Sequence, residues 1–300
     1  MKTIRISISE LAAICNVSPG TVDRALNNRS GINPQTKEKI LKVAKEYGYR
    51  PCVGESTDKI KGRIGIIVFN LENEYFSKLI EEVEQILCEA NYATTIMLSH
   101  YDKQREIECI RSLYNMGVDG IILCPVNSGE EFENYLKLFH IPIITTGNRI
   151  GSTAYIGVDD FNAMKEFAGE LLQKDYEQII YFSPAINYET AHAQRLRYEG
   201  FMAALEGRDY SVVTDIEDIE ESYSPETLII CSTDYYALKV YFKAKNATIA
   251  GFDNIDILDK YKIKIHSVGY SLKEIAKDAF EMILQKNVRT KLIDHYTVFR

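Results

Sequence analysis

Residues 7–28 read SISELAAICNVSPGTVDRALNN and contain two short apolar runs, each of which follows a serine. Ser7 and Glu10 have the spacing of a capping box, in which each side chain accepts from a backbone N–H that the helix leaves free. A helix is therefore predicted to begin here, with one apolar face. It should end near Asn16, because asparagine tolerates the left-handed backbone of a tight turn.

Ser18 and Pro19 predict a second helix directly after this turn, because serine caps helix N-termini and proline suits the first helical position. Its inward face consists of Val22, Ala25 and Leu26. Two helices joined by such a short turn form a helix-turn-helix. The same capping logic at residues 33–34 predicts a third helix that runs to residues 47–48, so three helices could bury a small core.

The outward face of the second helix carries small, polar and basic residues: Gly20, Thr21, Asp23, Arg24 and Asn27. Such side chains suit a helix that enters the major groove of DNA. A helical hairpin with a purely structural role has the same caps, so the charge distribution matters. Residues 1–62 hold 11 Lys and Arg against 6 Asp and Glu, whereas the remainder holds 24 against 37. The basic N-terminal segment is called the head here, and the acidic remainder is called the body. This difference in charge indicates that only the head meets a polyanion.

The 300 residues predict two or three soluble domains with a full hydrophobic core. Because no apolar run approaches the roughly 18 residues of a membrane span and no signal-peptide pattern opens the chain, we expect a cytoplasmic protein without a membrane partner. The six cysteines are scattered without a C-x-x-C pair, and the five histidines show no metal-ligand spacing. We therefore expect neither disulfides nor zinc, and no metal or other cofactor.

The body alternates short β-branched runs with helical patterns. The expected strands are RIGIIVF, TTIML, GIILC, PIITT, YIGV, QIIYF, TLIIC and TIAGF, and helical stretches between them include 75–90, 104–116, 161–174, 192–206 and 235–245. This alternation is typical of parallel sheets covered by helices on both faces. The length favours two α/β lobes, whose ligands would bind at the carboxyl ends of the strands.

The head resembles the DNA-binding domain of the lac repressor (LacI/GalR) family. The family pattern is matched by Val17-Ser18, Thr21-Val22, Arg24, Leu26-Asn27, Thr36-Lys37-Glu38-Lys39 and Tyr49-Arg50-Pro51. The resemblance implies that Pro19, Gly20 and Arg24 occupy base-reading positions. It likewise implies that Ser18, Thr21, Asn27, Thr36 and Lys37 hold phosphates, which fix the register of the protein on DNA. It divides the chain into a helix-turn-helix domain (1–51), a linker or hinge (52–62) and an effector-binding and dimerisation domain (63–300).

The linker departs from the family pattern. Relatives follow Tyr-x-Pro with Asn and a hinge helix whose leucine wedges into the minor groove, whereas this chain reads PCVGESTDKIKG. A flexible linker remains an equal alternative to a hinge helix, with Ile60 as the one candidate wedge.

The body resembles the periplasmic-binding-protein-like effector domain of the same family, through GVDGIILCP, YIGVDD, RLRYEGF and AGFDN. The implied fold is an all-α helix-turn-helix head plus an α/β domain with two parallel-sheet lobes. The positions that match the family's effector contacts are Asn73, Phe76, Asn148, Arg149, Arg197, Asp234, Asp253 and Tyr270. Between Phe201 and TLIIC, where relatives insert a strand and a helix, the chain has only a short acidic run, DIEDIEESYSPE, so we expect a trimmed second lobe.

Together these features predict a transcriptional regulator, in the expected case a repressor, that binds a pseudo-palindromic operator as a homodimer and responds to a small molecule, a sugar or sugar derivative. The body alone would also fit a solute-binding protein, but the head argues against it. An enzyme is disfavoured: neither G-x-S-x-G nor a phosphate-binding glycine loop is present, and Asp159-Asp160 is better explained as a helix start than as a catalytic pair. We expect no catalytic residues.

Overall fold

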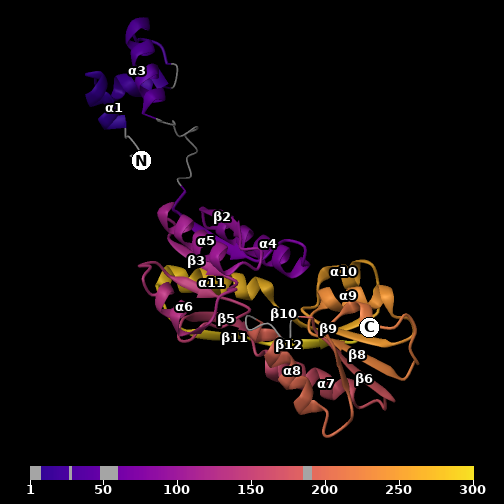
Figure 1. Ribbon diagram of the computed structural model, residues 1–300. Helices are drawn as coiled ribbons and strands as arrows, with labels where there is room; N and C mark the ends of the chain where they lie inside the picture. The colour runs from indigo at the N-terminus through magenta and orange to yellow at the C-terminus, as the bar shows by residue number, and fades with distance from the viewer. Residues whose placement is uncertain (1–7, 27–28, 48–59, 185–190) are drawn as a thin grey trace. The chain divides into compact units, whose positions relative to one another are not determined.

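The computed structural model describes residues 8–26, 29–47, 60–184 and 191–300. The chain divides into two compact units, Met1–Asp58 and Lys59–Arg300 (Figure 1). The boundary falls within the predicted linker. Residues 52–59 of this linker lie outside the described residues, so the choice between a hinge helix and a flexible linker stays a prediction. Among the described residues, no helix is long and apolar enough to cross a membrane.

The first unit contains three helices: α1 (Ile8–Cys15), α2 (Pro19–Leu26) and α3 (Pro34–Glu46). All three lie where the sequence predicts them. Asn16 has a φ of 56°, as expected for the turn. Ser18 Oγ accepts from the Thr21 amide at 3.2 Å, and Asn33 Oδ1 accepts from the Gln35 amide at 2.9 Å, so both predicted caps are formed. The predicted cap Ser7 lies outside the described residues.

The three helices bury a small apolar core of their own: Leu11, Ala12, Cys15, Val22, Ala25, Ile40 and Ala44. Every helix contributes to it, which explains how so short a segment can fold as a unit. Val17, in the turn between α1 and α2, packs against this core.

The first lobe of the second unit has a six-stranded parallel sheet in the order β11-β5-β4-β3-β1-β2. Its strands are β1 (Gly62–Val68), β2 (Tyr92–Leu98), β3 (Gly120–Leu123), β4 (Ile143–Thr145), β5 (Ala154–Val158) and β11 (Thr290–Ile293). One face is covered by α4 (Glu74–Glu89) and α11 (Leu272–Gln285), the other by α5 (Lys103–Asn115) and α6 (Gly129–Leu136).

The second lobe has a sheet in the order β12-β10-β9-β8-β6-β7, parallel except for the β10–β12 pair. Its strands are β6 (Gln178–Phe182), β7 (Ser211–Val213), β8 (Thr227–Cys231), β9 (Thr248–Phe252), β10 (Ile265–Tyr270) and β12 (His295–Val298). One face is covered by α7 (Asp160–Leu171) and α8 (His192–Ala204), the other by α9 (Asp234–Lys243) and α10 (Asp256–Lys260).

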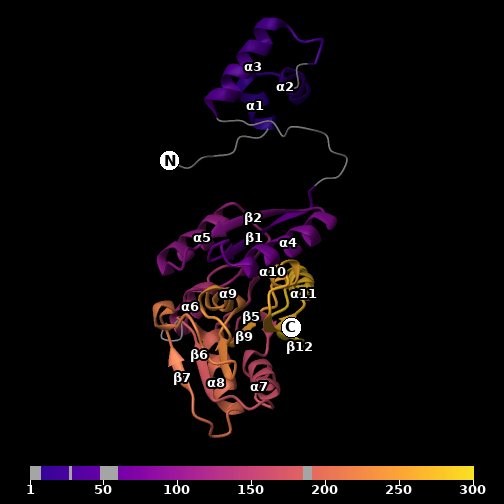
Figure 2. The same ribbon diagram turned by 90° about the vertical axis from the view of Figure 1, so that its right-hand side faces the viewer.

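The chain crosses between the lobes three times: from β5 to α7, from β10 to α11, and from β11 to β12. Figure 2 shows the two lobes stacked, with α4, α5 and β2 in one and α7, α8 and β6 in the other. The predicted fold class, a helix-turn-helix head and two parallel-sheet lobes, is confirmed.

The eight predicted strands are all present, but the sequence does not predict β7, β10, β11 and β12, nor α6, α10 and α11. The expectation of no strand between Phe201 and TLIIC is wrong, because Ser211–Val213 forms the edge strand β7. It was missed because three half-exposed residues paired on one side carry little β-strand signal. No helix was expected there either, and the stretch contains a single 3-10 turn, η1 (Ile216–Asp218).

Candidate functional site

The exposed face of the head carries the residues that the sequence predicts to meet DNA. Ser18, Pro19, Gly20 and Arg24 are exposed, whereas Thr21, Thr36 and Lys37 are half-buried. Asn27 lies outside the described residues. The hydroxyl groups of Ser18 and Thr21 lie 2.9 Å apart at the start of α2 and so present paired hydrogen-bonding groups at a helix N-terminus. This arrangement suits phosphate contacts.

Asp23 adds an acidic side chain to the same helix. Its carboxylate lies 3.2 Å from Nη1 of Arg29, just beyond the end of α2. The ion pair offsets the negative charge that would otherwise oppose a polyanion. Arg24 therefore remains the cationic side chain of α2 best suited to a base edge.

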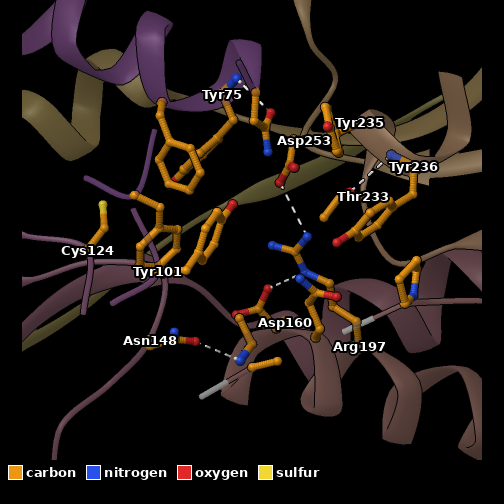
Figure 3. Close-up of a pocket in the computed structure, with 18 of the residues that line it drawn as sticks. Tyr75, Tyr101, Cys124, Asn148, Asp160, Arg197, Thr233, Tyr235, Tyr236 and Asp253 are labelled. Carbon is orange, nitrogen blue, oxygen red and sulfur yellow. Dashed lines mark hydrogen bonds and ion pairs between the residues drawn. The ribbon is translucent and has the colours of Figure 1, made fainter. Parts of the chain in front are cut away.

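A cavity of about 1130 Å³ lies between the two lobes of the second unit (Figure 3). Its lining comes from the carboxyl ends of strands in both sheets. Examples are Phe69 after β1, Tyr101 after β2, Asp160 after β5 and Asp253 after β9. The site is therefore where parallel sheets generally bind ligands.

Arg197 of α8 stands at the centre of this cavity and is 6% exposed. Its Nε donates to Oδ1 of Asp160 at 2.7 Å, and its Nη1 lies 3.4 Å from Oδ1 of Asp253. Nη1 also donates to the Ser232 carbonyl at 2.9 Å. The guanidinium plane covers the Phe252 ring, with 3.7 Å between Cζ and the ring centroid. These contacts fix the guanidinium in one orientation.

Burial has the largest effect on the pKa values of the carboxyl groups in this cluster. It raises the pKa of Asp253 to about 6, although Arg197 and the Tyr270 hydroxyl oppose the rise. Burial also raises the pKa of Asp160, again against the influence of Arg197. Burial alone would lower the pKa of Arg197, but Asp160 and Asp253 together raise it above its ordinary value, so the guanidinium stays charged.

The cluster leaves hydrogen-bonding groups for a ligand. Tyr270 donates its hydroxyl to Oδ1 of Asp253 at 2.9 Å, and the contact with Arg197 falls on the same oxygen. Within the described part of the chain, Oδ2 of Asp253 and Nη2 of Arg197 make no hydrogen bond. One acceptor and one cationic donor thus lie side by side, the combination that pairs with neighbouring hydroxyl groups.

Three further predicted residues line the cavity. Asn73 lines it and also caps α4, with Oδ1 accepting from the Tyr75 amide at 3.1 Å. Phe76 lines it from the same helix. Asn148 reaches across from the first lobe: its Oδ1 accepts from the Ala193 amide of α8 at 3.1 Å, and its Nδ2 donates to the Pro125 carbonyl at 3.0 Å.

Two predicted residues do not line the cavity. Arg149 is exposed to solvent beyond its edge. Asp234 is fully buried beneath it, where both carboxylate oxygens accept from the Ser267 hydroxyl at 2.8 Å and Oδ2 accepts from the Ile255 amide at 3.1 Å. Burial and the neighbouring Asp253 raise the pKa of Asp234 to about 7. Asp234 thus supports the loop that carries Asp253.

The sequence did not single out the aromatic wall of the cavity, which includes Phe69, Tyr75, Tyr101, Tyr155, Phe182, Tyr235 and Tyr236. Tyr155 lies near the start of β5, whereas each of the others follows or ends a strand or lies in the first turn of a helix. For those residues the position after a predicted strand was a usable signal. Asp160 was predicted only as part of a helix start. That prediction is confirmed by Asp159, whose Oδ1 accepts from the Asn162 amide at 3.0 Å, but Asp160 also pairs with Arg197.

The described side chains favour neither a metal site nor a cysteine nucleophile. In the described ranges, no group of three or more His, Cys, Asp or Glu residues could hold a metal ion. Cys124 lines the cavity, but burial raises the pKa of its thiol well above the ordinary value, so it is not poised as a nucleophile.

Two family descriptions match the chain. "Bacterial regulatory proteins, lacI family" matches residues 7–52, and "Periplasmic binding proteins and sugar binding domain of LacI family" matches residues 61–261. The second match alone spans more than half of the chain.

Curated relatives agree with these matches. Catabolite control protein A of Priestia megaterium is 25% identical over 97% of this chain and 95% of its own length. The NTD biosynthesis operon regulator NtdR of Bacillus subtilis is 29% identical over 69% of this chain, and the chain spans 62% of the length of NtdR.

Solved structures share the fold. A periplasmic binding protein/LacI transcriptional regulator from Alkaliphilus metalliredigens, complexed with D-xylulofuranose, has a TM-score of 0.68 at 18% identity over 80% of this chain and 98% of its own. The lac repressor dimer bound to operator and the anti-inducer ONPF has a TM-score of 0.67 at 13% identity, over 99% of this chain and 98% of its own.

Proposed function

The chain belongs to the LacI family of bacterial regulatory proteins, and from this premise we propose that it is a sequence-specific DNA-binding transcriptional regulator controlled by a sugar. The observation that carries the proposal is that one chain contains both the helix-turn-helix head and a lobed unit whose cavity holds Arg197 and Asp253. A solute-binding protein would need only the second unit. Catalysis is not proposed, because the described lining residues of the cavity include no activated nucleophile.

In the head, we assign base reading to the exposed residues Pro19, Gly20 and Arg24 of α2. The hydroxyl and amide groups of Ser18, Thr21, Asn27 and Thr36, with the ammonium of Lys37, are assigned to phosphates. Since one head offers few base contacts, two heads related by a two-fold axis would read a pseudo-palindromic operator, as a homodimer. A regulator of this kind works where DNA is, in the cytoplasm.

In the cavity, we assign the first sugar contacts to Arg197 and Asp253. The free Nη2 of Arg197 donates to one hydroxyl and the free Oδ2 of Asp253 accepts from its neighbour, while aromatic rings cover the C–H faces of the sugar. Asn73, Phe76, Asn148 and Tyr270 complete this group of contacts. Arg149 and Asp234 are left out, because neither lines the cavity.

We expect sugar binding to change DNA binding through the arrangement of the two lobes. A sugar that contacts both lobes favours one lobe arrangement, and in a dimer this arrangement changes how the two heads can be presented. A coupling free energy of about 1–3 kcal/mol suffices to change operator occupancy severalfold to a hundredfold. The sign of the response, release or tighter binding, is left to experiment.

Selection of duplexes from a random pool by the purified full chain tests the proposal. We expect enrichment of a two-fold-symmetric sequence and steep loss of binding with increasing salt. Equal retention of all duplexes at every salt concentration would contradict the proposed role of the head in sequence-specific DNA recognition.

A further inference from the structure

Resting on the proposed function, we propose that the cavity takes an uncharged saccharide of two or more rings and rejects phosphorylated sugars. Four features support this ligand class: the charge of the lining, the state of the helix N-termini around it, the volume of the cavity, and an aromatic wall that comes from both lobes.

The lining is rich in carboxylates. Its acidic side chains are Glu72, Asp160, Asp215 and Asp253, and its basic side chains are Lys103, Arg197 and Lys239. Among the described lining residues, anions therefore outnumber cations. A sugar phosphate, which brings about two negative charges at neutral pH, would enter a lining that is already net negative.

The cations of the lining are committed elsewhere or exposed. Arg197 is neutralised by two carboxylates, at 2.7 Å and 3.4 Å. Nζ of Lys239 lies over the Tyr235 ring, 4.4 Å from its centroid, in a cation–π contact. Lys103 is exposed at the first turn of α5. The lining thus offers a phosphate one buried cationic donor, Nη2 of Arg197, and the charge of that guanidinium is already balanced by two carboxylates.

Helix N-termini are the other common phosphate sites. Six helices begin beside lining residues, and in α5 and α11 the Arg105 and Glu274 amides already donate to Asp102 at 2.6 Å and to Ser271 at 3.1 Å. The other four helices are α4, α7, α8 and α9. Each of these N-termini already has a side-chain acceptor. Asn73 caps α4, Asp159 caps α7, Asn148 caps α8 from the opposite lobe, and Thr233 caps α9. Their acceptor-to-amide distances are 3.1, 3.0, 3.1 and 3.3 Å. A phosphate would have to displace one of these caps.

The size of the cavity favours more than one ring. Its volume of about 1130 Å³ exceeds the range of roughly 300–1,000 Å³ in which proteins bind drug-sized ligands. The group around Arg197 and Asp253 offers one donor and one acceptor, enough for two neighbouring hydroxyls of one ring. The remaining space is bounded in part by aromatic side chains.

The aromatic wall for the second ring comes from both lobes. Tyr101 stacks on Phe69 with centroids 4.7 Å apart and an interplanar angle of 29°, yet it is 57% exposed, so its other face is open. Burial raises the pKa of Tyr101 to about 12, and the phenols of Tyr236 and Tyr235 add to the rise. Figure 3 shows Tyr101 on one side of the cavity and Tyr235 and Tyr236 on the other.

A saccharide panel measured with the full chain tests this inference by thermal shift and titration calorimetry. The probes are glucose, galactose, xylose and ribose; maltose, cellobiose, lactose, sucrose, trehalose and maltotriose; and glucose 6-phosphate and fructose 1-phosphate. We expect the tightest binding from a di- or trisaccharide, with each phosphate ester at least about 100-fold weaker. Tyr101→Ala should weaken that saccharide about tenfold while its component monosaccharide changes less than about twofold.

Tyr261→Ala is the matched control, because Tyr261 is 65% exposed and lies outside the lining. It should leave all affinities unchanged. Tightest binding by a phosphate ester or a monosaccharide, or equal losses at Tyr101 for one ring and two, overturns this inference and leaves the sugar-controlled regulator standing. Binding of none of the probes overturns both the inference and the sugar part of the proposed function, whereas duplex selection tests the head separately.

Discussion

Gly200 of α8 lies against the backbone of α7 so closely that a Cβ at this position would stand 2.2 Å from the carbonyl oxygen of Phe161. The two helices carry the partners of the central ion pair, Arg197 and Asp160. Glycine at position 200 therefore lets α8 approach α7 closely enough for the pair to form. This explains physically why an arginine is followed by glycine three residues later in RYEGF.

Gly200→Ala is expected to destabilise the chain by about 1–3 kcal/mol, because the methyl group meets backbone that cannot move away. Gly169→Ala in α7 is the matched control, since a Cβ there has no heavy atom within 4 Å. Alanine is the better helix former, so the control should gain up to about 1 kcal/mol. Urea unfolding measures both, and equal effects of the two substitutions would contradict the close approach.

Asp234 predicts a pH dependence of stability. Its pKa of about 7 in the folded chain lies above the ordinary value of 3.8, so its contribution is fully present below pH 3.8 and is lost as pH rises through 7. Relative to Asp234→Asn, the free energy of unfolding of the unaltered chain should fall between about pH 4 and 7, by at most about 1.4 kcal/mol per pH unit.

The comparison with Asp234→Asn matters because other groups titrate nearby. Burial, and to a smaller extent Arg300, lowers the pKa of His266. Protonation of His266 at low pH therefore reduces the free energy of unfolding. This contribution is common to both proteins and cancels in the difference. A difference that stays constant or grows from about pH 4 to 7 would show that Asp234 does not hold a proton in the folded state.

Asn148→Ala should cost about 1 kcal/mol of stability, because its Oδ1 supplies the cap that α8 lacks from its own N-cap residue, Ala191. The contact also joins the two lobes, so sugar affinity should fall as well. Asn115→Ala, on the exposed last turn of α5, is the control and should change stability by less than about 0.5 kcal/mol. Unfolding curves in urea that coincide for the two variants would refute a capping role.

The head residues should separate into two kinds. Arg24→Ala should lose about 1–3 kcal/mol on the selected duplex and discriminate less among bases at one position. Lys37→Ala should weaken all duplexes alike and reduce the salt slope by about one. Fluorescence anisotropy over a salt series distinguishes them, with Lys260→Ala in the second unit as the charge-matched control. Interchanged behaviour of the two variants would reverse the assignment.

The head could be predicted almost completely from the sequence, because its signals are local. The left-handed Asn16 and the caps at Ser18 and Asn33 each depend on residues within a few positions. Eight strands were predictable from their β-branched runs; seven of them are largely buried, and the eighth, β2, is a half-buried edge strand. The edge strand Ser211–Val213 was not, since it is short and pairs on one side only.

The cavity was less predictable, because its members meet only through the fold. Asp160 and Arg197 are 37 positions apart, and no periodicity signals their contact. Asp234 follows a strand like the true lining residues, but its side chain turns beneath the cavity to Ser267, which lies on β10. Tyr101 reaches the cavity through two consecutive residues with positive φ, and sequence spacing does not indicate that turn.

The most direct test of sugar-controlled DNA binding is the anisotropy of a labelled, selected duplex titrated with the full chain, with and without the saccharide that binds most tightly. We expect the midpoint to move by at least about fivefold, a coupling of about 1 kcal/mol. Arg197→Lys, which keeps the charge but loses the fixed donor geometry, should bind the bare duplex equally well and show no shift. Coincident midpoints with and without saccharide, or a full shift in Arg197→Lys, would contradict the account.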